Sequence, residues 1–511
     1  MSLPSLRPDL ARYAREIADI ARAAGLDFFE TRFEMVDFDT MQEIAAYGGF
    51  PQRYPHWRFG MEYEKLRKQH VYGLGKIYEM VINNDPCYAY LVNDNSTVDQ
   101  KLVMAHVYAH CDFFKNNYWF SKTNRKMMDE MANHATRIRR HIDRYGSDRV
   151  ERFIDTCVSI DNLIDPHAPF MQRTPPRDEE RRGISPEREV EQDIVRYKSK
   201  PYLESWINPP AETSKQREAL LAERERKKHK LPPQPMRDVL QFFLENAPLE
   251  DWEADILSMI REEAYYYAPQ GQTKIMNEGW ATFWHSRLMT TRILQDDEII
   301  TYADHHSGTV HMPPGQLNPY KIGVELFRDI EDRWNKGRFG KEYDECKSME
   351  EKRKWDKKLG LGMEKVFEVR RIYNDVTFID EFLTPEFVDR FRMYHYRFDP
   401  STRRMVVVNR DFDKIKAQML FMLTNHAQPY LYVLDGNYAN RGELYLGHKH
   451  HGVDLDIKYA VETLKNVQRL WRRPVHLQAL INDEMVLFSY DGEQSQQQKL
   501  HGDMPPPAHT V

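Results

Sequence analysis

Two histidines four residues apart, His106 and His110, are the first side chains in this sequence that could do chemistry together. The residues around them, from Leu102 to Val107, are mostly apolar and include no Pro or Gly, which predicts a helix. Residues four apart on a helix lie on one face, one turn apart, so both imidazoles could reach the same ion. This spacing is typical of helices that offer two nitrogens to zinc or a similar metal.

A carboxylate from another part of the chain is needed to complete such a site. The stretch Asn277–His285 is predicted to be helical, and its Glu278 would give the two-His-one-Glu ligand set of catalytic zinc sites. A His pair alone is weak evidence in a chain with 20 His, so Glu278 is what makes the interpretation specific. We predict a divalent metal, with zinc expected, bound by His106, His110 and Glu278. His285 is one of several candidates for a fourth ligand.

The position after the first histidine, where zinc hydrolases usually carry their general base, is Val107. Valine cannot accept a proton, so a base must come from another element. Glu262 and Glu263 on the preceding predicted helix, and His306 in a His-rich loop, are the candidate proton-transfer groups. The alternative is that both carboxylates belong to an ordinary charged helix face and that His306 is an ordinary polar residue.

An aromatic stretch near the N-terminus, Tyr47–Gly60, contains too many Pro and Gly residues for regular helix. Two interpretations remain open for it. The loop is packed by its own aromatic side chains, or it forms a substrate-facing lip that uses His56 and Arg58.

Composition bounds the class of protein. A chain of 511 residues predicts two or three domains, and a net charge of −6 gives no case for nucleic-acid binding. The four cysteines are widely spread with no CxxC, which is typical of a reducing compartment and not of a disulfide framework. No apolar run is long enough to span a membrane, and no signal region opens the chain. We therefore expect a cytoplasmic protein.

The fold class predicted from the patterns is α+β. Residues 1–385 are expected to form a mainly helical domain that holds the metal site, with one of its helices over 61–82. Two segments in it, 172–201 and 208–236, are rich in charge and Pro and are predicted to be mobile.

Strands and helices alternate after residue 385. The order βαββαβ over 386–490 predicts a ferredoxin-like C-terminal module. Residues 491–511, with a run of Gln and several Pro, are predicted to be a disordered tail.

Four long motifs are present in the chain: Tyr47–Met61, His106–Asn117, Gln272–Ala281 and Asn318–Gly323. Together they resemble the SpoVR family (stage V sporulation protein R). The resemblance implies roles in spore cortex formation or in stationary-phase stress programmes, with a PrkA-type serine kinase and a YeaH/YhbH-type protein as partners. Asn117, which closes the second motif, is predicted with His56 and Arg58 to bind substrate.

Shorter segments, Glu278–Ala281, Pro314–Gln316 and Tyr320–Gly323, resemble parts of gluzincin metallopeptidases. That resemblance implies a gluzincin-like helical body, in which Tyr320 donates a hydrogen bond to the developing oxyanion. Two hypotheses follow. Either the site cleaves amide bonds of a peptide, protein or cell-wall precursor, or the chain is an inactive scaffold that binds partners in a kinase-linked stress or sporulation complex.

Overall fold

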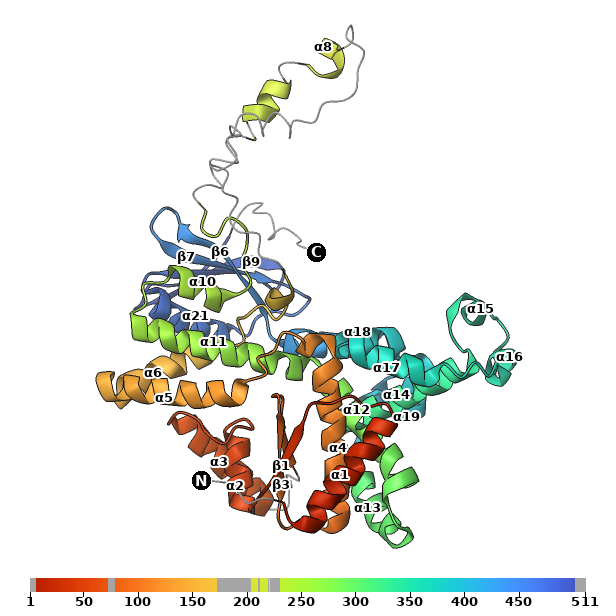
Figure 1. Ribbon diagram of the computed structural model, residues 1–511. Helices are drawn as coiled ribbons and strands as arrows, with labels where there is room; N and C mark the ends of the chain where they lie inside the picture. The colour runs from red at the N-terminus through yellow and green to blue at the C-terminus, as the bar shows by residue number, and fades with distance from the viewer. Residues whose placement is uncertain are drawn as a thin grey trace. The chain divides into compact units, whose positions relative to one another are not determined.

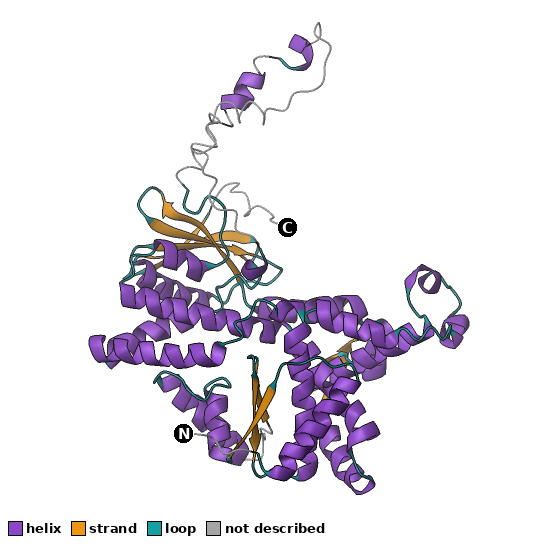
Figure 2. Cartoon of the chain, viewed as in Figure 1, coloured by secondary structure: helices purple, strands orange, loops and turns teal. Residues whose placement is uncertain are grey.

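The computed structural model describes residues 6–71, 79–171, 204–209, 212–218, 220 and 230–500. Contacts between Cα atoms divide the chain into two units, each built from two stretches that are distant in sequence. The first unit comprises Met1–Glu151 and Tyr265–Gln428, and the second comprises Arg152–Ala264 and Pro429–Val511. This division differs from the boundary that we predicted near residue 385. Figures 1 and 2 show that helices predominate in the first unit and that the largest sheet lies in the second.

A three-stranded sheet in the first unit has the order β1-β3-β2. β1 (Thr31–Val36) runs parallel to the central strand β3 (Cys87–Val92), and β2 (Glu79–Ile82) pairs antiparallel with its other side. The helix predicted over 61–82 is therefore wrong at its C-terminal end. α3 (Trp57–Val71) is helical, whereas Glu79–Ile82 pair with β3, because cross-strand pairing overrides the helical pattern that the preceding residues set up.

The His-pair helix α4 (Thr97–Asn116) begins at a capping box, in which Ser96 and Asp99 bond each other's backbone N–H groups. The helix is buried along most of its length between α1 (Pro8–Ala23) and β3 (Figure 1). Its apolar side chains belong to the main hydrophobic core of the unit. A helix buried on nearly all sides holds its polar residues in fixed positions, which is what a ligand pair requires.

Two further helices build this region: α12 (Lys274–Leu288) packs against α4, and α14 (Pro319–Lys336) packs against α12. A Cβ added to Gly279 of α12 would lie 2.4 Å from the Cα of Gly323 on α14. The two helices therefore approach closely only because both positions are Gly. The N-terminus of α12 is fixed by buried Asp375, whose carboxylate accepts from the N–H groups of Ile275 (2.8 Å) and Met276 (2.9 Å).

The α+β fold class is confirmed, but the C-terminal sheet does not have ferredoxin-like topology. Its order is β10-β9-β8-β7-β6, with a single parallel pair, β7 with β8, joined through α21 (Ile457–Trp471). The expected first strand instead pairs in a separate two-stranded sheet of the first unit, β4 (His395–Asp399) with β5 (Arg404–Asn409). Local alternation predicts that a strand exists but not which strand it pairs with. The five strands are β6 (Tyr430–Tyr438), β7 (Glu443–Lys449), β8 (Val475–Ile481), β9 (Glu484–Tyr490) and β10 (Ser495–Lys499).

Part of the predicted disordered tail is ordered, because β10 pairs antiparallel with β9 through Ser495–Lys499. The rest of that tail from residue 501, the predicted mobile segment 172–201 and much of 208–236 lie outside the described residues. Among the described helices, none combines the length and the apolar character that crossing a membrane requires.

The remaining helices complete the two units. They are α2 (Phe38–Ala46), α5 (Met127–Tyr145), α6 (Ser147–Val158), α8 (Glu204–Ile207), α10 (Val239–Asn246), α11 (Asp251–Gln272), α13 (Ile299–Thr309), α15 (Gly340–Asp344), α16 (Met349–Lys354), α17 (Gly362–Ile372), α18 (Asp375–Phe382), α19 (Pro385–Phe391) and α20 (Phe412–Leu423).

Candidate metal centre

The side chains of His106 and His110 lie on one face of α4, where both residues are buried. Their Nε2 atoms are 2.9 Å apart, and the two rings are nearly perpendicular. From α12, Oε2 of Glu278 lies 3.6 Å from Nε2 of His106 and 3.5 Å from Nε2 of His110. The structure thus brings the three predicted ligands together in one buried cluster.

The two distances to Oε2 of Glu278 suit a metal ion, whereas the two imidazole nitrogens lie closer together than ligands of one ion do. Ligand bonds of 2.0–2.2 Å at tetrahedral angles put ligand atoms about 3.3–3.6 Å from one another. Oε2 of Glu278 is buried and has no hydrogen-bond partner among the described residues, whereas its Oε1 accepts from Lys274 at 2.5 Å. A buried carboxylate oxygen without a donor is costly unless a cation faces it.

The groups behind the imidazoles hold the rings in place. Nδ1 of His110 lies 2.8 Å from Oδ1 of Asn277, an acceptor, so Nδ1 carries the proton and Nε2 presents its lone pair to the cluster. Nδ1 of His106 lies 2.9 Å from Nδ1 of His285. Metal-bound histidines usually have such partners on the second nitrogen. His and Glu groups are therefore positioned here to bind a metal ion.

His285 and His306 continue this chain of contacts. Nε2 of His285 lies 3.2 Å from Nδ1 of His306 on α13. Burial, reinforced by the charges of neighbouring histidines, holds the pKa of His285 well below its usual value, so this ring is neutral. His285 lies behind the ring of His106 and is not in the ligand cluster, and His306 lies one residue further out. The predicted proton-transfer role of His306 stays a prediction.

Glu79, which the sequence patterns missed, also faces the cluster. It opens the edge strand β2, and its Oε1 lies 4.0 Å from Nε2 of His106. Burial raises the pKa of Glu79, and the nearby His106 and His110 oppose that rise. The carboxylate was missed because the segment was interpreted as helix, and no short-range signal links position 79 to the His pair.

Tyr320, at the start of α14, reaches the same cluster. Its ring is stacked on His106 with 6.3 Å between ring centroids. Burial and the charges of Glu278 and Glu79 raise the pKa of Tyr320, which keeps the hydroxyl protonated as a hydrogen-bond donor. The close approach of α12 and α14 at Gly279 and Gly323 is what places this ring beside Glu278.

The other predicted catalytic residues, Glu262 and Glu263, lie on α11 in the second unit. The cluster described above is built from the first unit alone. Their role in proton transfer stays a prediction.

The predicted substrate-binding residues make mainly local contacts. His56 packs against Tyr54 and Phe59, and the guanidinium of Arg58 lies over Phe59 and donates to the Tyr54 hydroxyl. These contacts fit the interpretation of a loop packed by its own aromatic side chains, and the substrate role of both residues stays a prediction.

Asn117 joins the end of α4 to α17. Its Nδ2 donates to the carbonyls of Arg370 (2.7 Å) and Tyr373 (3.0 Å), and its Oδ1 accepts from the N–H of Trp119 (3.0 Å). Both amide hydrogens and the carbonyl oxygen are therefore used within the fold. These contacts make Asn117 a structural joint, and its substrate role stays a prediction.

The fold and the cluster together define an α+β protein with buried His and Glu side chains positioned to bind a metal ion. The chain belongs to the SpoVR family: residues 6–428 match the family described as SpoVR like protein, and residues 429–482 match the SpoVR-like C-terminal domain. It is 29% identical over 503 residues to the uncharacterized protein YcgB of Escherichia coli (strain K12), covering 93% of this chain and 92% of that one. No solved structure matched the chain. The resemblance seen in the motifs is thereby confirmed.

Proposed function

We propose that His106, His110 and Glu278 bind zinc and that the site cleaves amide bonds in a peptide, a protein or a cell-wall precursor. One observation carries the proposal: three buried ligand atoms from two helices converge, and one of them, Oε2 of Glu278, has no hydrogen-bond partner among the described residues. Two nitrogens and one carboxylate oxygen are a ligand set that zinc uses when it also has an open position for chemistry.

The bound ion would supply Lewis-acid chemistry, polarising the amide carbonyl and activating a water molecule for attack. The chain's own residues would do the rest. Glu79 would accept the proton of the attacking water, since it is the carboxylate beside the ligands that is not itself in the ligand cluster. Tyr320 would donate a hydrogen bond from its hydroxyl to the oxygen on which charge develops.

Glu79 would be the general base, a role that Val107 cannot have. Val107 is fully buried in the main core, so that position serves packing. Because the base would lie on β2 and not on α4, the core around Val107 needs no ionisable group. An unpaired charge in that core would be strongly destabilising. The site therefore keeps a carboxylate in reach of the substrate even though the helix lacks one.

Metal content is the first test. The purified whole chain should contain about one zinc per chain by elemental analysis, and His106→Ala or Glu278→Gln should remove it. His311→Ala is the matched control, because His311 is exposed and outside the cluster, and its metal content should equal that of the parent. A parent chain without zinc, or zinc that survives both ligand changes, contradicts the proposed site.

Hydrolysis is the second test. The purified chain is incubated with peptides from a digested protein and with cell-wall peptides, and mass spectrometry should show new amide cleavage. A chelator should stop this cleavage, and added zinc should restore it. A zinc-loaded chain that cleaves none of these points to the alternative, an inactive scaffold. The predicted cytoplasmic location and the predicted partners, a PrkA-type kinase and a YeaH/YhbH-type protein, fit either outcome.

A further inference from the structure

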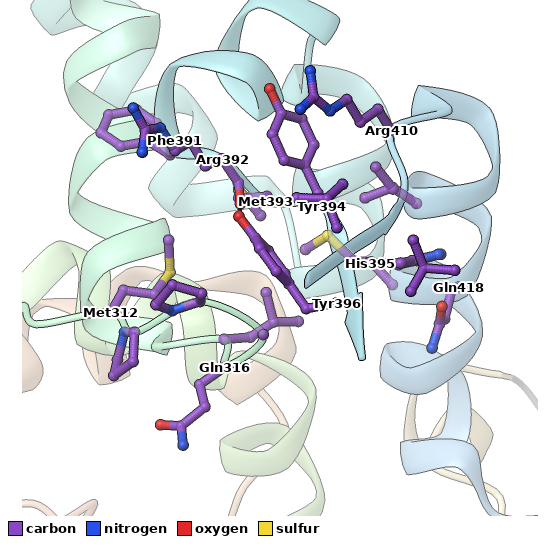
Figure 3. Close-up of a pocket in the computed structure, with 18 of the residues that line it drawn as sticks. Met312, Gln316, Phe391, Arg392, Met393, Tyr394, His395, Tyr396, Arg410 and Gln418 are labelled. Atoms are coloured by element: carbon purple, nitrogen blue, oxygen red, sulfur yellow. Dashed lines mark hydrogen bonds between the residues drawn. The ribbon is translucent and has the colours of Figure 1, made fainter. Parts of the chain in front are cut away.

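A large open pocket lies in the first unit, apart from the metal cluster. It has a volume of about 1290 Å³, and none of its lining residues belongs to the cluster described above. Three segments form it: the loop Met312–Leu317, the chain from Phe391 through β4, and β5 with the facing side of α20 (Figure 3). Gly315 lets the loop approach closely, because a Cβ there would lie 2.8 Å from the Met405 methyl carbon.

The pocket exposes apolar surface. Four of its lining residues are large apolar side chains that remain 38–58% exposed: Leu317, Val407, Val408 and Met422. Buried Met393, Ile415 and Met419 form part of the lining beneath them. Several methionines make such a surface adaptable to different apolar side chains. Contiguous exposed apolar surface of this kind is typical of an interaction site.

Positive charge borders this apolar surface. Arg392, Arg397 and Arg410 line the pocket, and the lining contains no Asp or Glu. None of the three arginines forms an ion pair with a carboxylate within the described part of the chain; Arg410 instead lies over the ring of Tyr394 at 5.1 Å. Figure 3 shows Arg392 and Arg410 on different sides of the pocket. Arginines left without carboxylates favour an anionic ligand.

We propose that this pocket binds an acidic, partly apolar peptide segment of a partner protein. Its apolar side chains would cover the Val and Met surface, and its carboxylates would pair with Arg392, Arg397 and Arg410. A peptide fits better than one small anion, because the volume exceeds the roughly 300–1,000 Å³ of small-molecule pockets and three arginines line the pocket together with apolar side chains. The two-stranded sheet β4–β5 also leaves one edge of each strand free, among the described residues, for backbone pairing.

The test is a selection of random displayed peptides on the whole chain, followed by fluorescence anisotropy with the enriched peptides. The enriched peptides should carry Asp or Glu beside Leu, Met or Phe. The double change Arg397→Ala with Arg410→Ala should weaken their binding by at least about tenfold, since a hydrogen bond to a charged group is worth that much or more. Higher salt should weaken binding to the parent chain, because exposed charge pairs are screened.

Arg404→Ala is the matched control. Arg404 lies on the same strand pair and is exposed, but it does not line the pocket, so peptide affinity should stay unchanged. Met422→Gln tests the apolar surface and should weaken binding while urea unfolding stays as in the parent. Enriched peptides without acidic residues, or equal affinity in the double variant, overturn the proposal. The proposal is also wrong if no peptide is enriched and the parent chain binds phosphatidylglycerol vesicles that the double variant does not bind. The pocket would then bind a lipid surface.

Discussion

The two imidazoles of the metal cluster differ in what lies behind them. His110 contacts an amide oxygen, which fixes the position of its proton, whereas His106 contacts another imidazole, His285, whose ring is neutral. The two oxygens of the Glu278 carboxylate also differ: Oε1 accepts from Lys274, whereas Oε2 has no hydrogen-bond partner among the described residues and faces the cluster. Each ligand is therefore oriented by one group, and that group offers a way to weaken the site without removing a ligand.

Asn277→Ala should lower zinc affinity by about 10–100-fold, because His110 loses the acceptor that fixes its tautomer and ring position. Competition with a chromogenic chelator measures this change. Asn93→Ala is the control: Asn93 is exposed, directly follows the end of β3 and lies outside the cluster, so the affinity should stay unchanged. Equal affinities in parent and Asn277→Ala would show that the amide does not orient His110.

Glu79→Gln and Glu278→Gln should behave differently although both remove one carboxylate. Glu79→Gln should keep zinc and lower turnover of a cleaved substrate by about 10²–10⁴-fold, since glutamine cannot accept the proton. Glu278→Gln should lose zinc. Elemental analysis and initial rates on the same preparations separate the two effects. If Glu79→Gln loses zinc as fully as Glu278→Gln, Glu79 is a ligand and the base lies elsewhere.

At the scale of elements, the site depends on a helix crossing and on one sheet edge. α12 supplies Glu278, and α14 supplies Tyr320 three residues before Gly323. Because Gly279 adjoins Glu278, the contact that sets the distance between the helices lies one residue from a ligand. The motifs Glu278–Ala281 and Tyr320–Gly323 thus combine a functional residue with the small residue that positions it.

Gly279→Ala and Gly323→Ala should each lower the free energy of unfolding by about 1–3 kcal/mol or more, because each added Cβ overlaps the backbone of the facing helix segment. Urea unfolding measures the change. The control is Gly308→Ala on α13, where a Cβ meets no atom within 4 Å; its stability should stay equal or rise by up to about 1 kcal/mol. Similar values for all three variants would contradict a tight α12–α14 contact.

At the scale of the whole molecule, the second unit does not coincide with one continuous stretch of chain. Its sheet follows residue 429, but α10 and most of α11 come from the segment before residue 265. Within this unit Phe242 of α10 is stacked on Trp471 of α21, and Met236 bridges Val433 of β6. The family match that ends at residue 482 stops before β9, which pairs with β8 along its whole length.

A chain truncated after Gln428 should therefore lose order in α10 and in α11 before Tyr265, since the sheet that buries Phe242 and its neighbours is removed. Hydrogen exchange should be faster there than in the whole chain. The first unit provides the internal control, because α4 and α12 should keep their protection in the truncated chain. Unchanged protection of α10 would show that it does not depend on the C-terminal sheet.

Local patterns in the sequence determined much of this protein. Helical spacing put His106 and His110 on one face, and alternation after residue 385 indicated strands in the regions where β4 to β9 occur. These predictions succeed because periodicity and capping depend on neighbours along the chain. A family-type motif was enough to select Glu278, although it contacts residues far away in sequence.

Only the tertiary structure decided which residues meet. The contact of His110 with Asn277 spans 167 residues, and Glu79 reaches the cluster through strand pairing that its own neighbours did not predict. The side-chain amide of Asn117 donates to the backbone carbonyls of Arg370 in α17 and of Tyr373 directly after it. β4 pairs with β5 and not with the C-terminal sheet. Long-range packing sets all four outcomes, because burial against distant elements outweighs the weak preference of any short segment.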